Sequence, residues 1–411
     1  MKMKYFSTLL LSVALFAACS ENENEKYTVI LSLDSFRADY PDSCSTPNLD
    51  RMAKEGVYAN VWTSYPNNTL SNNISVATGY YPWKHGIVAD KFWDEKRGEY
   101  FDYNDPQKRN DATFYTGSPI WSRLEEQNIK TGVLYWAGCD IEIEGQKPTY
   151  YKSSFDSDKV LNSEERLETI VSWLKLPKEE RPRFIMAQLE DENKTIETYG
   201  PESPEAYAYA EKTDEMVGKF LKKIKSLRNS KNINLIITSN QGMTEIKKNQ
   251  TIDIYDYIDS KWINRIEGKN PLFVYAKEEF RDSIYERLCR VDNMYVFKNE
   301  DIPEDLRYRA KENISGNVMI APGIGWQIKG YENETVKGMN GYFPVYQDMR
   351  VVFRAIGPDF KKGYDGLDFF NVDIYPFVEN LYGLENKRVN GWYKRVEDLH
   401  ISFKGEIVAP E

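Results

Sequence analysis

The chain has 411 residues, 41% of them hydrophobic and 14% aromatic, which is enough for one large α/β domain with a smaller subdomain and argues against disorder. The net charge of −10 and the lack of any basic run argue against a nucleic-acid polymer as partner, because phosphate binding needs clustered Lys and Arg. Only two histidines are present, which restricts zinc chemistry because imidazole is its commonest nitrogen ligand.

The N-terminal sequence predicts an export signal. A basic start, Met1–Lys4, precedes an apolar run of about 13 residues over Phe6–Ala18, too short to span a membrane. The sequence up to Cys19 resembles a bacterial lipoprotein box, in which the signal is cut before a lipidated cysteine; an ordinary signal peptide is the alternative. We therefore expect a signal peptide over 1–18, an acidic tether over 19–26, and an extracytoplasmic protein anchored by lipid to a bacterial membrane, periplasmic or at the cell surface.

Three cysteines remain beyond the signal: Cys44, Cys139 and Cys289. Their number is odd and their spacing is not that of a zinc site. A Cys44 to Cys139 disulfide is open in an oxidising compartment, and the sequence does not decide it.

The rest of the chain alternates strand and helix patterns. Apolar runs rich in β-branched residues predict strands buried on both faces at Tyr27–Leu33, Gly132–Trp136, Phe184–Leu189, Asn234–Ser239 and Arg350–Ile356. Helix starts are expected where a hydroxyl residue precedes a proline, at Thr46, Ser118 and Ser203. This order predicts an α/β domain over 27–411 with a mostly parallel sheet, helices on both faces and a small inserted capping subdomain at about 246–330.

Polar residues follow the ends of three of these strands. Asp34 comes after the first, Asn193 lies a few residues beyond Leu189, and Asn240 comes directly after Ser239. Since ligands of open α/β sheets bind outside the carboxyl ends of the strands, we expect these loops to converge on one crevice.

A family resemblance is carried by motifs spread along the chain in order. They are Val29–Tyr40, Thr46–Asp50, Glu55–Val57, Thr69, Thr78–Pro82, His85–Val88, Tyr135–Gly138, Pro148–Tyr151, Tyr199–Pro201, Gly242–Met243, Met349–Pro358, Asp373–Pro376 and Asn390–Gly391. In these residues the chain resembles the type I phosphodiesterase/nucleotide pyrophosphatases of the alkaline phosphatase superfamily. The resemblance implies an alkaline-phosphatase-like fold and a two-zinc hydrolase in which Thr69 is the nucleophile.

The metal ligands that the resemblance implies are mostly replaced. Asp34 and Thr69 are retained, whereas Asn193, Glu197, Asn240, Gln241 and Asn340 stand where the family has Asp, His, Asp, His and His. His85 belongs to a retained structural motif and His400 to the tail, so neither restores a ligand. Amides are poor zinc ligands, so we expect no cofactor, with Ca²⁺ or Mg²⁺ as the alternative for an all-oxygen set.

Four further positions bear on the ligand. Asp90 stands where the family has an asparagine that holds phosphoryl oxygens, and a carboxylate there would repel a phosphate by roughly 4 kcal/mol at 4 Å and an effective dielectric of 20. Tyr150 and Tyr151 match positions where some relatives stack a nucleobase. Leu70 replaces the phenylalanine on the other side of that stack, which weakens a nucleotide prediction.

Three hypotheses follow. The first is a metal-deficient pseudoenzyme that binds a small ligand or a protein partner. The second is an active phosphodiesterase that hydrolyses phosphate esters through Thr69 with a recast divalent-metal site. The third is a surface spacer whose crevice has no ligand, which a test of ligand-induced stabilisation would distinguish. Thr69 and Asn72 could also act only as caps of the helix that follows.

Overall fold

The structure is a computed structural model that describes residues 25–155, 159–190, 194–308, 316–329 and 336–401. The expected signal peptide, Cys19, most of the acidic tether and Asn193 lie outside the described residues.

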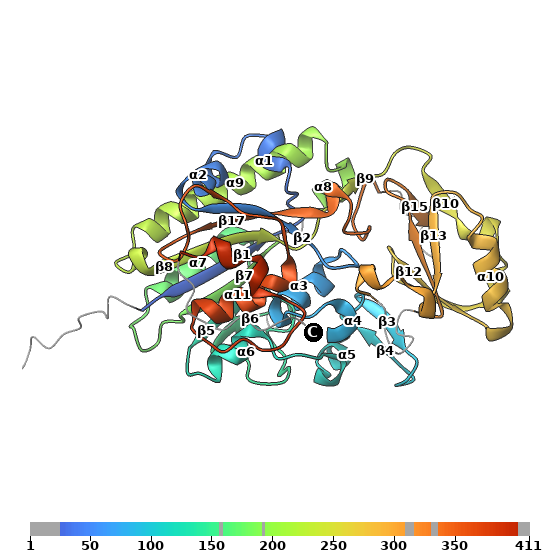
Figure 1. The fold of residues 1–411 in the computed structure, drawn as a ribbon, viewed down its shortest axis with the longest axis horizontal. Coiled ribbons are helices and arrows are strands. Elements are labelled where there is room, and N and C mark those ends of the chain that lie inside the picture. Colours follow the sequence, from blue (N-terminus) through green and yellow to red (C-terminus); the bar gives the residue numbers. More distant parts are fainter. Residues whose placement is uncertain (1–24, 156–158, 191–193, 309–315, 330–335, 402–411) are drawn as a thin grey trace, which may run out of the picture.

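A nine-stranded mixed sheet forms the centre of the molecule, with strand order β18-β2-β17-β8-β1-β7-β5-β6 and β19 beside β2 (Figure 1). Its strands are β1 (Tyr27–Leu33), β2 (Val57–Trp62), β5 (Thr131–Leu134), β6 (Tyr150–Lys152), β7 (Phe184–Leu189), β8 (Ile233–Ser239), β17 (Arg350–Ile356), β18 (Tyr364–Asp365) and β19 (Phe369–Phe370). β1 pairs in parallel with both β7 and β8, whereas β17 is antiparallel to β8 and β2. β1, β7 and β8 are buried along their whole length, as their continuous apolar sequences predict.

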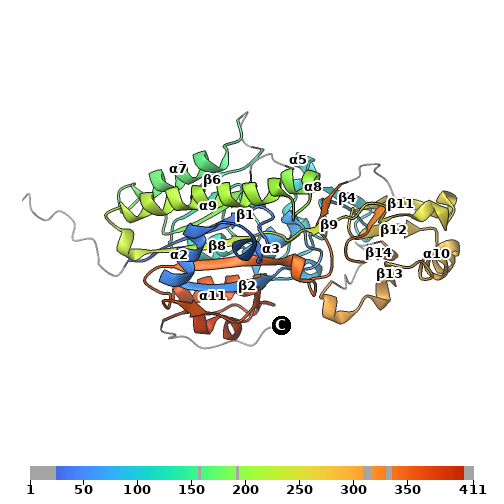
Figure 2. The same cartoon turned by 90° about the horizontal axis from the view of Figure 1, so that it is seen from above.

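Helices cover both faces of this sheet (Figure 2). They are α1 (Tyr40–Ser43), α2 (Pro47–Glu55), α3 (Thr69–Thr78), α4 (Pro82–His85), α5 (Pro106–Arg109), α6 (Ile120–Glu125), α7 (Ser163–Leu174), α8 (Thr195–Tyr199), α9 (Pro204–Lys225), α10 (Arg281–Leu288) and α11 (Ile374–Leu381). α2, α7 and α9 pack in one core cluster with β1, and α3, α6 and α11 pack in another on the opposite face. Within the described ranges, no helix combines the length and apolarity needed to cross a bilayer.

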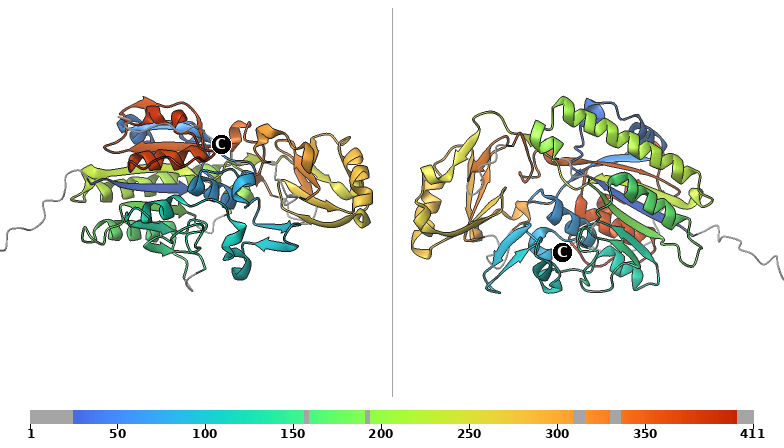
Figure 3. Two further views of the ribbon diagram at one scale, coloured as in Figure 1. Left: turned by 60° about the horizontal axis from the view of Figure 1, so that its bottom comes forward. Right: turned by 180° about the vertical axis from the view of Figure 1, so that it is seen from behind.

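A second, smaller sheet stands beside the first (Figure 3). Its antiparallel strands follow the order β11-β12-β14-β13, and α10 packs on it through Ile284 and Leu288. These strands are β11 (Ile263–Glu267), β12 (Leu272–Ala276), β13 (Met294–Lys298) and β14 (Val318–Pro322). Two-stranded ladders accompany it: β9 (Thr244–Glu245) with β16 (Gly338–Met339), and β10 (Thr251–Asp253) with β15 (Gln327–Lys329). We call the segment 251–329 the cap.

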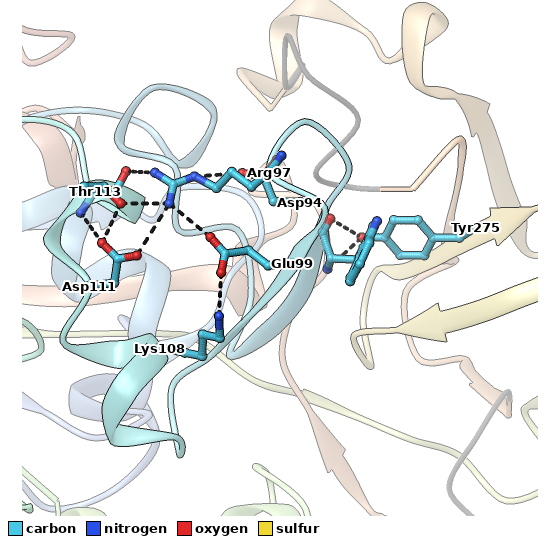
Figure 4. A network of polar contacts seen from close by, with 8 residues as sticks. Asp94, Arg97, Glu99, Lys108, Asp111, Thr113 and Tyr275 are labelled. Atoms are coloured by element: carbon cyan, nitrogen blue, oxygen red, sulfur yellow. Dashed lines mark hydrogen bonds and ion pairs between the residues drawn. The ribbon is translucent and has the colours of Figure 1, made fainter.

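The cap is attached to the main body through the hairpin of β3 (Lys91–Asp94) and β4 (Glu99–Asp102). The Tyr275 hydroxyl donates to the Trp93 carbonyl at 2.9 Å and accepts from its N–H at 3.1 Å (Figure 4). The Arg265 guanidinium lies 4.0 Å from the centre of the Trp93 ring. In the turn between β3 and β4, Arg97 forms hydrogen bonds to Thr113, which fixes the hairpin to the main body.

The expected fold class is confirmed: a mostly parallel sheet, helices on both faces and a small cap. The strand expected at Gly132–Trp136 instead ends at Leu134, because Tyr135 takes a left-handed backbone conformation with φ 56°. Of the three expected hydroxyl caps, only Ser203 accepts a helix N–H, from Ala206; α2 and α6 begin without one. Cys44, Cys139 and Cys289 are all free thiols, so the open Cys44 to Cys139 disulfide does not form.

Candidate ligand-binding site

Strand register brings the first two site residues together. Leu33 of β1 lies beside Ser239 of β8, so the next residues, Asp34 and Asn240, leave the sheet side by side at its carboxyl edge. Leu189 of β7 lies on the other side of Leu33, and the chain continues from there to Glu197 on α8. The sequence therefore determines which side chains meet, because the ends of parallel neighbours meet at one edge.

Thr69 is the first residue of α3. Asn68, not Thr69 or Asn72, caps this helix, with its side-chain oxygen accepting the Ser71 N–H at 2.8 Å. Asn72 is buried and instead braces the preceding loop, where it accepts the Ser64 N–H and donates to the Asn68 carbonyl. This arrangement leaves the Thr69 hydroxyl free of a capping role.

Asn240 connects the two retained residues. Its amide nitrogen lies 3.1 Å from Asp34 Oδ1 and 3.2 Å from Thr69 Oγ1, within hydrogen-bond distance of both. Its amide oxygen accepts the Ser35 backbone N–H at 3.1 Å. A backbone N–H can only donate, so this contact requires the oxygen on that side and turns the NH₂ group towards Asp34 and Thr69.

The two other described amide substitutions continue the network towards the cap. Gln241 donates to Ser35 Oγ at 2.9 Å, and Asn340 donates to the Gln241 side-chain oxygen. Asn270, at the start of the turn into β12, donates to the Asn340 carbonyl at 2.8 Å. Side-chain amides and one hydroxyl thus link the cap to the carboxyl edge of the main sheet.

Three carboxylates lie around this network. Burial raises the pKa of Asp34 to about 6; hydrogen bonds from Asn240 and Ser35 oppose the rise, and the Glu197 charge adds to it. Desolvation also raises the pKa of Asp90, an exposed residue directly before β3, while Lys269 opposes this. Desolvation therefore disfavours the charged forms of Asp34 and Asp90.

The zinc pair that the resemblance implies does not fit these residues. Between Asp34 and Thr69, where a cation would need lone pairs, the chain presents the NH₂ of Asn240, which can only donate. In the part of the chain that the structure describes, no group of three or more His, Cys, Asp or Glu side chains could hold a metal. His85 is buried with Nε2 against Ser75 Oγ and Nδ1 accepting the Ile87 N–H, and burial lowers its pKa to about 3, so it is structural.

A cavity of about 1710 Å³ lies over the site, between the main sheet and the cap. Asp34, Thr69, Asp90, Glu197, Gln241 and Asn340 all line it. The sequence did not single out the cap residues of the opposite wall, such as Arg265, Lys269 and Asn270. Their segment lacks a period or motif that would place it over Asp34, and only the tertiary fold brings it there.

Leu70, Tyr150 and Tyr151, the possible ligand contacts, are not among the described residues that line this cavity. Leu70 is 4% exposed and packs in the core with Tyr65 and Ile74, because it points inward from α3. Tyr150 stacks near Trp173 on the outer strand β6 and donates to the Glu180 carbonyl. Tyr151, 37% exposed, lies near Lys147. Their role as possible ligand contacts stays a prediction, and their contacts in the structure are packing contacts.

Comparisons with known proteins agree with this fold. Residues 28–343 match the family model "Type I phosphodiesterase / nucleotide pyrophosphatase". The chain is 30% identical to an uncharacterized pyrophosphatase/phosphodiesterase of Schizosaccharomyces pombe, over 91% of this chain and 80% of that protein. It is also 30% identical to the bis(5'-adenosyl)-triphosphatase ENPP4 of Bos taurus, over 97% of this chain and 87% of that protein.

A solved structure gives the same result. Murine ectonucleotide pyrophosphatase/phosphodiesterase 5 superposes with a TM-score of 0.85 at 27% identity, covering 91% of this chain and all of the other. The chain therefore belongs to the type I phosphodiesterase/nucleotide pyrophosphatase family.

Proposed function

We propose that this protein is a non-catalytic member of its family that binds a ligand in the cavity beneath the cap. The observation that carries the proposal is the orientation of Asn240, whose NH₂ group faces both Asp34 and Thr69. A threonine hydroxyl at its ordinary pKa is a weak nucleophile and needs a base or a metal ion to take its proton. An amide donor at hydrogen-bond distance supplies neither.

The N-terminal sequence extends this proposal to the protein's location. A lipidated Cys19 after a cleaved signal would hold the domain outside the cytoplasm on a bacterial membrane, with a small molecule or a protein rather than a nucleic-acid polymer as partner. Cell fractionation of a Cys19→Ala variant tests the anchor: release into the soluble fraction is expected, and unchanged membrane retention would contradict it.

Elemental analysis and a turnover assay test the absence of catalysis. We expect purified protein to carry no stoichiometric zinc and to show no Thr69-dependent hydrolysis of p-nitrophenyl phosphodiesters in a panel of divalent metals. Thr69→Ala is the matched control, because it removes only the hydroxyl and one methyl group at the cavity wall. Zinc at two ions per chain, together with turnover abolished in Thr69→Ala, would overturn the proposal.

The alternative is an active hydrolase with a hard divalent cation. It is favoured by one observation: Thr69, Asp34 and Glu197 face a single cavity, and carboxylate oxygens suit Ca²⁺ or Mg²⁺. A relative, murine ENPP5, has been solved as an inactive Thr-to-Ala variant in complex with AMP. AMP is therefore the first nucleotide to test here. Hydrolysis that requires added Ca²⁺ or Mg²⁺ and is lost in Thr69→Ala would establish this alternative.

A further inference from the structure

The amino edge of the main sheet is the edge at which its parallel strands begin. Tyr27 of β1 lies beside Ile233 of β8, Thr28 lies beside Phe184 of β7, and Phe184 lies beside Thr131 of β5. β17 runs in the opposite direction and therefore ends at the same edge. This edge lies on the side of the main body away from the cap (Figure 1), whereas the cavity lies at the carboxyl edge.

The amino edge is basic although the chain as a whole is acidic. It consists of the segments directly before β1, β5, β7 and β8 and directly after β17, which are 25–26, 126–130, 175–183, 226–232 and 357–363. Together these segments carry ten Lys and Arg residues against five Asp and Glu residues, whereas the net charge of the chain is −10. Ion pairs within the edge leave this positive surplus unchanged. The cavity wall carries five residues of each sign and has no such surplus.

Contacts join neighbouring segments of the edge into one surface. The Arg183 N–H donates to the Lys130 carbonyl at 2.9 Å, and the Lys130 ammonium donates to the Glu179 carbonyl at 2.6 Å. Lys26 pairs with Asp359 across the start of β1. Four basic residues on three of the segments are exposed to solvent: Lys175, Arg228, Lys231 and Lys362.

A second observation is that the chain enters the fold through this edge. The Glu25 carboxylate lies 3.5 Å from the Lys178 ammonium and 3.6 Å from Nε of Arg183. Cys19 precedes Glu25 by six residues, which extend over at most about 20 Å. A lipid on Cys19 would therefore keep the amino edge close to the membrane surface. The cavity lies beyond the seven residues of β1, which rise by about 3.3 Å each.

From the charge of this edge and the entry of the chain we propose that the amino edge binds anionic lipid headgroups and holds the anchored protein with its cavity facing away from the membrane. The inference rests on the proposed lipid anchor at Cys19 and goes beyond it by assigning the surface that meets the membrane. Attraction of Lys and Arg to an anionic bilayer extends over about one Debye length, about 8 Å at physiological salt, so a short tether brings the edge into range. The tether carboxylates Glu21 and Glu23 reduce the positive surplus but do not reverse it.

Lysine acetylation followed by mass spectrometry tests this orientation. The lipidated protein is reconstituted in vesicles of phosphatidylcholine, with or without the anionic phosphatidylglycerol. We expect Lys175, Lys231 and Lys362 to be acetylated about fivefold or more slowly on the anionic vesicles, because the headgroups cover each amine and favour its unreactive, protonated form. Lys247 and Lys261, which are exposed next to and on the cap, should react equally on both kinds of vesicle.

Charge reversal separates binding by the edge from the effect of the tether alone. In the Arg228→Glu/Lys231→Glu/Lys362→Glu variant, Lys175 should lose its slower acetylation on anionic vesicles, because the positive surplus of the edge becomes a negative one. All three substituted side chains are exposed, so the fold is expected to tolerate the changes.

Arg290→Glu/Lys247→Glu/Lys248→Glu is the matched control, because it reverses the same residue types at exposed positions on or next to the cap. It should leave the slower acetylation of Lys175 unchanged. Equal acetylation of the edge on both kinds of vesicle, or an equal effect of the two triple variants, would overturn the proposal. A protein that floats with neither kind of vesicle would contradict the lipid anchor and this inference with it, so the two failures are distinguishable.

Discussion

Two carboxylates of this protein, Asp373 and Asp34, differ in how many of their oxygens accept hydrogen bonds from the surrounding chain. Asp373, just before α11, has a side chain that is 0% exposed and accepts four hydrogen bonds. Two come from Arg395, at 2.7 and 2.6 Å, and two from the backbone N–H groups of Phe370 and Trp392. Asp34, beside the cavity, has contacts from Asn240 and Ser35 to one oxygen only.

The difference separates structure from function. Where a carboxylate stabilises the fold, the chain itself supplies donors and a cation, because an unpaired buried charge is expensive. Where the chain leaves oxygens unpaired beside a cavity, local stability has been given up, and such places are expected at functional sites. The following predictions test whether the two carboxylates differ in this way.

The largest effect is expected at the structural carboxylate. Asp373→Asn removes the partner of Arg395 and turns one accepting oxygen into a donor that faces donors. We expect a loss of about 4 kcal/mol in the free energy of unfolding, as for other broken buried pairs. Urea denaturation followed by circular dichroism measures it. If Asp373→Asn proved no more destabilising than Asp34→Asn, the distinction between the two carboxylates would be wrong.

A second buried carboxylate, Glu379, should make the stability of the protein depend on pH. Burial raises the pKa of Glu379 to about 7 from its ordinary 4.5, although the Lys387 N–H and Arg123 act in the opposite direction. Between pH 4.5 and 7 the folded chain therefore binds more protons at Glu379 than the unfolded chain. Its contribution to stability is complete below pH 4.5 and is lost as the pH rises through 7, by at most about 3 kcal/mol. In a plot of the urea midpoint against pH, wild-type protein should lose stability between pH 4.5 and 7, and Glu379→Gln should lack this decrease. An unchanged decrease in Glu379→Gln would show that another group titrates.

The smallest expected effect is a gain in the free energy of unfolding, at Asp34. Because the folded pKa of Asp34 is raised to about 6, the wild-type chain at pH 8 carries the full cost of ionising this carboxylate in the fold. Asp34→Asn removes that charge and keeps an oxygen for the Asn240 amide. We expect a gain of about 1 kcal/mol in stability after allowing for the partial exposure of Asp34. Destabilisation at pH 8 in metal-free urea titrations would show that Asp34 is structural, like Asp373.

The sequence predicts the scaffold of the site better than its chemistry. The runs over Tyr27–Leu33 and Phe184–Leu189 predict β1 and β7 with their observed bounds, because a strand buried on both faces needs a continuous apolar sequence. Asp34 and Asn240 could be placed at one edge for the same reason. β2, in contrast, alternates buried and half-buried residues at the side of the sheet and was not anticipated.

The fine geometry of the site lies beyond such patterns. Nothing in the sequence around Asn240 states that the Ser35 N–H fixes its amide, since that bond joins residues 205 positions apart. The position of Tyr150 is likewise set by the tertiary fold. The family resemblance makes it a possible ligand contact, and the structure shows β6 carrying it to the outer edge of the sheet, where it packs against Trp173.

The fixed amide of Asn240 limits what a charged residue at this position can do. If an aspartate stood at this position, the Ser35 N–H would still hold one oxygen, and the other would face Asp34, about 3 Å from its carboxylate. Two unit charges at about 4 Å repel by roughly 4 kcal/mol at an effective dielectric of 20. A single Asn240→Asp substitution would thus destabilise the metal-free protein. A divalent-cation site at this edge of the sheet would therefore need changes at several positions together.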